Sequence, residues 1–255
     1  MSLRPRIMPT LLLKEDALVK TIKFSKPNYL GDPINALKIF NGKGVDEVCI
    51  LDIDASYKKK EPNFGYLKDI ASEAFMPLSY GGGITNLNQI KEIFYIGYEK
   101  VIINSSFIEN PNLIKEAANF AGSQSIVVSI DYKKNLFGQR FCYSHGGKAK
   151  QKIGPVELAV KAQEYGAGEI FLNSIDRDGT MQGYDIEIIK EVVDALTIPV
   201  TACGGAKNVA DIKKVLLEGK AHAAAAGSMF VYYGPHKAVL INVPSEKDLF
   251  DNNIY

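Results

Sequence analysis

The sequence contains little cysteine, no tryptophan and no large excess of either charge. Its three cysteines are far apart in 255 residues, and Cys49 and Cys203 fall in apolar runs, so we expect reduced core thiols rather than disulfides. The 30 basic residues balance 29 acidic ones, which argues against nucleic-acid binding. Apolar residues 10–13 are too few for a signal or membrane-spanning segment. We therefore expect a cytoplasmic protein without a membrane partner.

The chain repeats itself with an offset of 122 residues. The segment Pro77–Asn86 reappears as Pro199–Asn208, with a glycine run at the same place in each. The same offset pairs Glu47 with Glu169, Asp54 with Asp176, and Ser106 with Ser228. An internal repeat of half the chain indicates a fold built from two similar halves.

Short β-rich runs alternate with helical patterns along the whole chain. The predicted strands are Arg6–Leu13, Glu47–Ile53, Pro77–Tyr80, Lys100–Asn104, Ser125–Asp131, Glu169–Ser174, Pro199–Cys203 and His222–Ala226. The predicted helices are Pro33–Gly42, Phe64–Ala74, Leu87–Ile96, Pro111–Phe120, Pro155–Tyr165, Ile186–Leu196 and Val209–Leu217, and Pro33, Pro111 and Pro155 are placed as first helical residues.

Eight strands alternating with helices in 255 residues predict one α/β domain with the (β/α)8 TIM-barrel fold. Its half-barrels are about 5–122 and 123–234, with a short irregular tail at 235–255. An open doubly wound sheet is the alternative, but no Gly-x-Gly-x-x-Gly follows the first strand. Two long loops follow strands: Phe24–Leu30, and Lys133–Lys152, which is typical of a β-hairpin over the barrel mouth.

Glycines and small polar residues follow strands in both halves, where backbone N–H groups can approach an anion. The first-half cradle comprises Gly82, Gly83, Asn104 and Ser105, and the second-half cradle comprises Asp178, Gly179, Thr180, Gly204, Gly205, Gly227 and Ser228. Each turn could instead be only a tight connection. Two cradles related by the repeat favour phosphate binding, and they indicate a substrate with a phosphate at each end.

These motifs closely resemble the cyclase subunit of imidazole glycerol phosphate synthase, from about Arg6 to Gly234. The resemblance rests on Gly31–Pro33, Leu51–Ile53, Gly81–Ile84, Asn104–Ser105, Ile130–Asp131, His145–Gly147, Gly166–Glu169, Asp176–Thr180, Gly183–Asp185 and Cys203–Gly205. The run Asp-Arg-Asp-Gly-Thr with Gly-Tyr-Asp behind it is highly specific.

The resemblance implies that a glutaminase partner docks at the bottom of the barrel. Its ammonia would pass through the barrel to a bis-phosphorylated substrate at the top, where addition, ring closure and cleavage follow. It also implies a charged ring that gates the ammonia entrance, here Arg6, Glu47, Lys100 and Glu169, and a lysine on loop one, here Lys20. All four ring residues stand at predicted strand starts. The alternative interpretation is that these charges are only exposed to solvent, as charges at strand starts often are. No cofactor and no metal site are expected, since no His, Cys and carboxylate cluster has metal-ligand spacing.

The chain departs from the family at the catalytic pair, which consists of two aspartates. Asp131 matches the strand-five aspartate, but Leu12 stands at the strand-one position and cannot transfer a proton. Loss of one general acid or base typically costs about 10²- to 10⁴-fold in rate. Asp16 could substitute if its loop bends back. Asn173 and Asp54 stand where the family usually has threonine.

Three functions compete. The first is an ammonia-accepting synthase subunit in which Asp131 transfers the proton; the strict histidine-pathway reaction is then doubtful because of Leu12. A branch of the family is associated with ammonia supply for acetamidino sugars in lipopolysaccharide and surface glycans, and the lost aspartate fits that role. The second is a non-catalytic scaffold that activates the glutaminase. The third is the related phosphoribosyl isomerase barrel, which needs two acid–base groups and no bottom gate.

Overall fold

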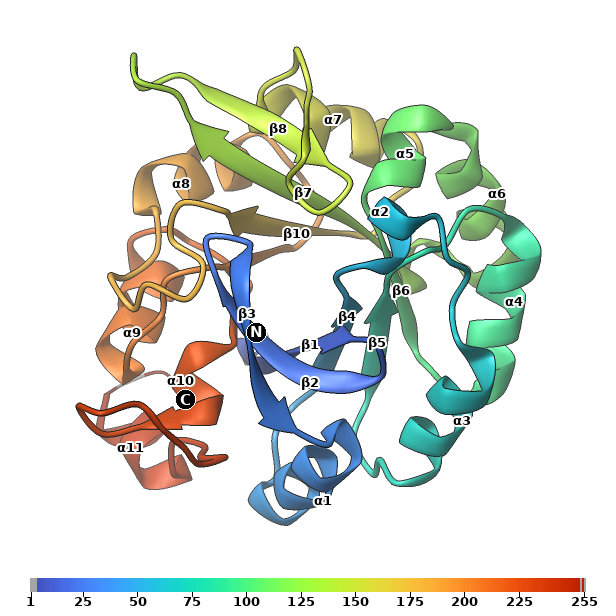
Figure 1. The fold of residues 1–255 in the computed structure, drawn as a ribbon. Coiled ribbons are helices and arrows are strands. Elements are labelled where there is room, and N and C mark those ends of the chain that lie inside the picture. Colours follow the sequence, from blue (N-terminus) through green and yellow to red (C-terminus); the bar gives the residue numbers. More distant parts are fainter. Residues whose placement is uncertain (1–3, 253, 255) are drawn as a thin grey trace.

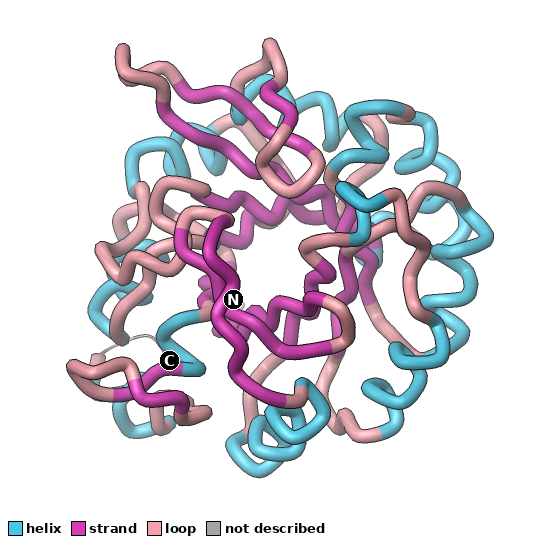
Figure 2. Tube along the Cα trace, in the orientation of Figure 1, coloured by secondary structure: helices cyan, strands magenta, loops and turns pink. Residues whose placement is uncertain are grey.

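Eight parallel strands form a closed ring in the computed structural model, which describes residues 4–252 and residue 254. The ring closes because the last strand pairs with the first, Arg6 lying opposite Ala223. Figure 1 shows the strands encircled by helices, and Figure 2 separates the inner strands from the outer helices by colour. The prediction of a TIM barrel is confirmed. The ring contains β1 (Arg6–Lys14), β4 (Val48–Asp52), β5 (Leu78–Gly81), β6 (Lys100–Ile103), β7 (Ile126–Lys134), β10 (Glu169–Ser174), β11 (Val200–Cys203) and β12 (Ala223–Ala226).

The helices cover the outside of the ring and bury their apolar faces against it. The long helices are α1 (Pro33–Lys43), α3 (Phe64–Ser72), α4 (Leu87–Ile96), α6 (Asn112–Ala121), α7 (Pro155–Glu164), α8 (Ile186–Asp194) and α9 (Val209–Leu217). Short helices α2 (Ala55–Lys58), α5 (Ser105–Glu109) and α10 (Ser228–Val231) and the 3₁₀ turn η1 (Ser123–Ser125) lie in the connections. Over the described ranges, none of the helices has the length and apolar character to cross a membrane.

The prolines mark two of the three helix starts as predicted. Pro33 and Pro155 are first helical residues, and the Asp32 carboxylate caps α1 by accepting from the Ile34 N–H at 2.8 Å. The prediction for Pro111 was wrong, because Pro111 is the residue before α6. The preceding Asn110 N–H still donates to the Ser106 carbonyl at 2.8 Å, so the chain there completes the end of α5.

The loop predicted at Phe24–Leu30 is largely strand β3 (Ser25–Gly31), so that prediction was wrong. It pairs antiparallel with β2 (Ala17–Ile22), which itself pairs with the end of β1. The segment is mostly exposed and contains Pro27 and Asn28, a composition typical of loops. An edge strand tolerates such residues because one side of its backbone makes no ladder bonds.

The hairpin predicted within Lys133–Lys152 is present. Strand β7 continues past the ring and pairs antiparallel with β8 (Arg140–Ser144), which pairs in turn with β9 (Ala149–Lys150). Figure 1 shows this hairpin standing beside the barrel mouth. The tail contains the β13–β14 ribbon (Tyr232–Tyr233 and Ala238–Val239) and α11 (Glu246–Asp251), while residues 253 and 255 lie outside the described part.

Alternating side chains on the strands divide the core into an outer and an inner layer. On β1, Ile7 and Leu11 pack toward the helices, whereas Met8 faces the inside of the ring. The inner layer comprises Met8, Cys49, Ile102, Val127, Phe171, Cys203, Ala223 and Ala225. This apolar layer fills the middle of the barrel and leaves polar side chains at its two ends.

Candidate active site

A ring of four charged side chains occupies the N-terminal ends of the strands. Arg6 donates to Glu47 and to Glu169, each at 2.7 Å, and Lys100 lies 2.9 Å from Glu47 and 3.1 Å from Glu169. The Thr201 hydroxyl also donates to Glu169. The structure thus brings all four predicted ring residues together, with both glutamates buried. Burial alone would raise the pKa of Glu169, but Arg6 and Lys100 outweigh it and lower this pKa.

A cavity of about 310 Å³ lies at the opposite end of the barrel, where the strands end. Seven of the predicted site residues line it: Lys20, Gly82, Asn104, Ser105, Asp131, Asp178 and Gly227. The other predicted cradle residues, Gly83, Gly179, Thr180, Gly204, Gly205 and Ser228, are not among its lining residues. The cavity reaches both cradles, which places one site across both halves of the chain.

Asp131 is a partly buried carboxylate that lines the cavity from β7. The side-chain amide of Asn173 donates to its Oδ1 at 3.2 Å, and that of Asn104 approaches its Oδ2 at 3.4 Å. Burial raises the pKa of Asp131 to about 7, Asn173 opposes this rise, and the nearby Asp178 adds to it. Such a carboxylate can both accept and return a proton near neutral pH.

Lys20 is held at the mouth by Asp178. The Lys20 ammonium donates to Asp178 Oδ1 at 2.6 Å, and the Thr21 hydroxyl donates to Oδ2 at 2.7 Å. The Phe24 N–H also donates to Oδ2, at 3.3 Å. Asp178 therefore holds Lys20 and the β2–β3 hairpin against the second half of the barrel.

The first-half cradle is bordered by acidic groups. Asp52 Oδ1 accepts from the N–H groups of Asp54 and Ala55 at 3.0 and 3.1 Å, at the start of α2. Burial raises the pKa of Asp52, and the backbone donors oppose that rise. The Ser105 hydroxyl accepts a hydrogen bond from the His145 N–H at 3.0 Å, so the β8–β9 turn contacts this cradle.

The conspicuous run Asp176–Thr180 mainly builds its own turn. Arg177 donates to the carbonyls of Gln182 and Gly183 at 3.0 and 2.9 Å, and the Thr180 hydroxyl donates to the Arg177 carbonyl at 2.8 Å. The Asp176 carboxylate accepts from the Lys134 N–H. Only Asp178 of this run lines the cavity. The Gly179 and Thr180 predictions thus fall on turn-forming residues, as the tight-turn alternative expects.

The sequence matches the family described as histidine biosynthesis protein over residues 6–237. A relative from Leptospira interrogans, named "Putative imidazole glycerol phosphate synthase subunit HisF", is 50% identical over 96% of this chain and 97% of its own. A relative from Pseudomonas aeruginosa carrying the same name with the symbol hisF2 is 47% identical over 96% and 98%. The "Imidazole glycerol phosphate synthase subunit HisF" of Petrotoga mobilis is 42% identical over 96% and 97%.

The chain belongs to the histidine biosynthesis protein family and is HisF-like. This finding confirms the resemblance drawn from the motifs. In the HisF-like chain Leu12 lines the cavity from β1, so an apolar side chain faces the space that contains Asp131. Asp16 lies past the end of β1, where its carboxylate accepts from the Asn63 amide at 3.2 Å, and it does not line the cavity. The proposed substitution by Asp16 is therefore not supported.

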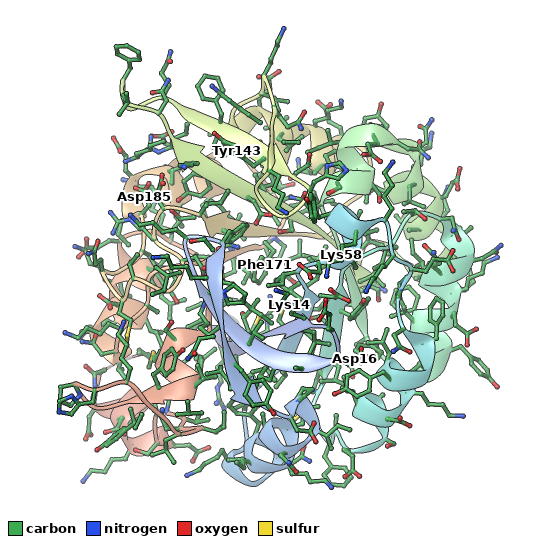
Figure 3. The ribbon with its side chains drawn as sticks, viewed as in Figure 1. Lys14, Asp16, Lys58, Tyr143, Phe171 and Asp185 are labelled. Atoms are coloured by element: carbon green, nitrogen blue, oxygen red, sulfur yellow. The ribbon has the colours of Figure 1, made fainter. Side chains whose placement is uncertain are left out.

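Sequence reasoning missed several residues that line the cavity of the HisF-like chain. Figure 3 shows Lys14 near the middle of the barrel mouth. Thr10, Leu12 and Lys14 alternate on β1 and all line the cavity, so the period of two could have identified Lys14. Lys148 reaches the cavity from the β8–β9 turn, and no sequence pattern indicates that.

Thiol and metal chemistry find little support in the HisF-like chain. Cys203 lines the cavity, but burial raises the pKa of its thiol to about 12, so it carries no nucleophilic thiolate near neutral pH. Cys49 and Cys142 are also buried and free. Within residues 4–252 and residue 254, no group of three or more His, Cys, Asp or Glu residues could hold a metal ion.

Proposed function

We propose that this chain is the ammonia-accepting synthase subunit of a two-subunit glutamine amidotransferase that resembles imidazole glycerol phosphate synthase. The observation that carries the proposal is the alignment of two polar sites on the same strands. The charged ring occupies one end of the barrel, and the cavity with Asp131 occupies the other. β10 contributes to both, because Glu169 of the charged ring and Asn173 of the cavity lie on this strand.

The ring is the proposed entrance for ammonia from a docked glutaminase. The two positive and two negative charges of the ring cancel, so the ring does not oppose the passage of neutral ammonia. An ion gains little there, because each ring charge already has a partner of opposite sign. Above the ring the inner layer is apolar. Ammonia that reaches the cavity would meet Asp131, a partly buried carboxylate that two side-chain amides contact.

The chemistry follows from that placement. The ammonia lone pair attacks an imine carbon of a bis-phosphorylated small molecule and forms a C–N bond, while the C=N π electrons move to the imine nitrogen. One N–H proton then passes to the Asp131 carboxylate, which returns it to that nitrogen, so that the nitrogen can leave as a neutral amine when its bond to the same carbon breaks. Gly82 and Ser105 in the first half and Gly227 in the second half would hold the phosphates, with Lys20 nearby as a cation.

A second candidate is ammonia delivery for acetamidino-sugar formation in surface-glycan or lipopolysaccharide synthesis. Leu12 favours it, because β1 presents a leucine to the cavity where the family has the second aspartate of its catalytic pair. The non-catalytic scaffold is the third candidate. It requires the ring but not Asp131.

The test is turnover of the histidine-pathway bis-phosphate intermediate with excess ammonium salt, which bypasses the glutaminase. The unmodified protein is compared with Leu12→Asp and Asp131→Ala. Turnover by the unmodified protein that Asp131→Ala abolishes supports the synthase. Turnover only in Leu12→Asp favours ammonia delivery to another acceptor. Glutamine hydrolysis by the partner glutaminase that is unaffected by Asp131→Ala, with no turnover in any variant, favours the scaffold.

A further inference from the structure

The turn between β8 and β9 crosses the first-half cradle and carries a lysine to the cavity. The His145 N–H of this turn donates to the Ser105 hydroxyl at 3.0 Å. An added Cβ on Gly146 would lie 3.3 Å from the Ile53 carbonyl oxygen, just after β4. Gly146 and Lys148 both line the cavity, and Lys148 is exposed. A ligand in the cavity can therefore reach this lysine.

The Lys148 ammonium rests on an aromatic ring. Its Nζ lies 2.8 Å from the centre of the Tyr57 ring on α2, and Figure 1 shows α2 beside the turn that follows β8. Tyr57 is 50% exposed. Within residues 4–252 and residue 254, the Lys148 ammonium forms no ion pair with a carboxylate. A cation over an exposed ring is held only weakly, so this ammonium is available to an anion.

Two other lysines around the cavity are already bound to carboxylates. Lys58, on the same helix as the aromatic ring, lies 2.6 Å from Asp54 and 2.7 Å from Glu15. Lys20 lies 2.6 Å from Asp178 on the side of the second half. An anion that enters the first-half cradle would have to break one of these ion pairs to recruit either lysine, whereas a lysine that rests on a ring loses no ion pair.

The first-half cradle requires a cation if it is to hold a phosphate. Gly82 and Ser105 line the cavity together with Asp52 and Asp54, and these two carboxyl groups, when ionised, repel an anion. Neutral N–H and hydroxyl groups beside two carboxylates give a phosphate little net attraction. The flexible four-carbon stem of Lys148 lets its ammonium leave the ring and turn into the cavity without a backbone movement.

We propose that Lys148 is the phosphate-binding cation of the first-half cradle: its ammonium leaves the Tyr57 ring and binds a phosphate held by Gly82 and Ser105. The inference rests on the proposed function, because it assigns a residue to one of the two phosphates of the proposed substrate. Lys14 is the competing cation, since it also lines the cavity, from β1. It does not lie on the turn that contacts the cradle, and the experiment separates the two lysines.

The sequence contains no tryptophan, so Tyr57→Trp provides a single fluorescent reporter under Lys148. The larger ring keeps the contact with the ammonium, because an indole binds cations best among the aromatic side chains. Sodium phosphate is compared with sodium chloride at equal ionic strength. We expect phosphate, and not chloride, to shift the emission, because the departure of the ammonium changes the field at the indole. Lys148→Met in the same protein should abolish this shift, and Lys148→Arg should retain it.

Phe141→Trp is the matched control. Lys150 lies 3.6 Å from the centre of the Phe141 ring, and neither residue lines the cavity. This second reporter should respond to phosphate no more than to chloride. Equal phosphate responses in the two reporters would show a general salt effect at surface lysines and would overturn the inference. A shift in Tyr57→Trp that survives Lys148→Met and disappears in Lys14→Met would also overturn it, because Lys14 would then be the cation.

Calorimetry with inorganic phosphate separates this inference from the proposed function. Lys20→Met serves as the background, because it removes the cation of the second half and leaves the first-half cradle to be measured. Adding Lys148→Met should weaken binding about tenfold, as expected for the loss of one hydrogen bond to a charged group, and adding Lys150→Met should leave it unchanged.

The outcomes of the calorimetry distinguish two failures. If the Lys20→Met protein binds phosphate equally well with and without Lys148, only the inference about Lys148 fails. If neither this protein nor the unmodified protein binds phosphate, the phosphate cradles of the proposed function fail, and the inference fails with them.

Discussion

The two halves of the barrel use the same backbone turn with different chemistry. Ser106 and Ser228 occupy equivalent positions in the repeat, and both are buried. The Ser106 hydroxyl donates to the Ile84 carbonyl, whereas the Ser228 hydroxyl has no partner among the residues described. At this position the first half pairs its serine hydroxyl, whereas the second half leaves its serine hydroxyl buried without a partner among the residues described. A duplicated backbone can therefore be kept while the two sites diverge.

The charged side chains beside the two cradles also differ: an aspartate lies at the first-half cradle and a lysine at the second-half cradle. In the first half, Asp52 uses the N–H groups at the start of α2 that an anion would otherwise bind. In the second half, Lys20 lies against Gly227, its Cε 2.9 Å from where a Cβ of that glycine would be. The catalytic contrast is similar, with Leu12 in the first half and Asp131 in the second.

Asp131→Asn should have the largest effect of any single change. We expect turnover to fall by about 10²- to 10⁴-fold, because one general acid–base group is removed, while Leu12→Asn, at the matching strand end, should change it far less. Steady-state rates with ammonium salt measure both. Equal losses in the two variants would contradict the assignment of proton transfer to the second half.

Asp131→Asn should also change stability with pH. Its pKa of about 7 in the folded protein exceeds the unfolded value of about 3.9. The ionised carboxylate therefore destabilises the folded state above the folded pKa, and this penalty fades as pH falls toward the unfolded pKa. Urea denaturation should show Asp131→Asn more stable than the unmodified protein at pH 8, and no such gain at pH 4.

The charged ring draws Arg6, Glu47 and Lys100 from the first half and only Glu169 from the second. Arg6→Met leaves two buried carboxylates with one cation, so we expect a loss of about 3–5 kcal/mol in the free energy of unfolding. Because the pKa of Glu169 is lowered, this stabilisation is present above about pH 4.3, the unfolded value. It is lost as pH falls through the folded pKa.

Urea denaturation at pH 7 and pH 3 measures the effect of the ring. The control is Lys220→Met, which removes an exposed pair with Asp194 at 3.4 Å and should cost less than about 1 kcal/mol. A similar loss in both variants, or a loss from Arg6→Met that persists undiminished at pH 3, would show that the ring does not stabilise the barrel through charge.

Gly83 and Gly205 test whether the two turns are equally constrained. An added Cβ would lie 2.3 Å from the Lys60 carbonyl oxygen in the first and 2.1 Å from the Gly183 carbonyl oxygen in the second, both at positive φ. Each alanine variant should lose about 2–4 kcal/mol in thermal or urea unfolding. Gly234→Ala, with positive φ but open space around it, should lose only about 1–2 kcal/mol.

The serines should give the smallest and most selective effects. Ser106→Ala removes a made hydrogen bond and should lower the free energy of unfolding by about 1 kcal/mol. Ser228→Ala removes an unpaired hydroxyl and should leave stability unchanged or slightly raised, while weakening inorganic phosphate binding measured by calorimetry. The opposite pattern would mean that the first-half cradle is the open one.

The barrel could be predicted from sequence because its signals are local and repeated. The strand starts Arg6, Lys100 and Glu169 placed the ring correctly, since parallel strands bring their N-terminal ends to one side. The β2–β3 hairpin was missed because Pro27 and Asn28 have loop-like propensities, whereas tertiary pairing makes them an exposed edge strand. Pairing with β2 overrides the intrinsic preference of these residues for loops.

The cavity could be predicted only in part. Gly82 and Gly227 line it, while Gly205 packs against the Gly183 carbonyl. All three are strand-end glycines, and sequence does not tell which faces a ligand and which faces a neighbouring turn. The role of Asn173 was also invisible, because it depends on Asp131 lying opposite it in the pairing of β7 with β10.

The closure of β12 onto β1 bears on how the molecule folds. Arg6 pairs with Ala223, so the first strand of the barrel must wait for the last before its second edge is covered. Loops of that span close slowly, and pairings distant in sequence dominate the folding time of such topologies. The charged ring depends on the same closure, because β1, which carries Arg6, is paired on both sides only after β12 has joined it. The four charged side chains therefore reach their final arrangement late in folding, and until then one edge of β1 remains open to other chains.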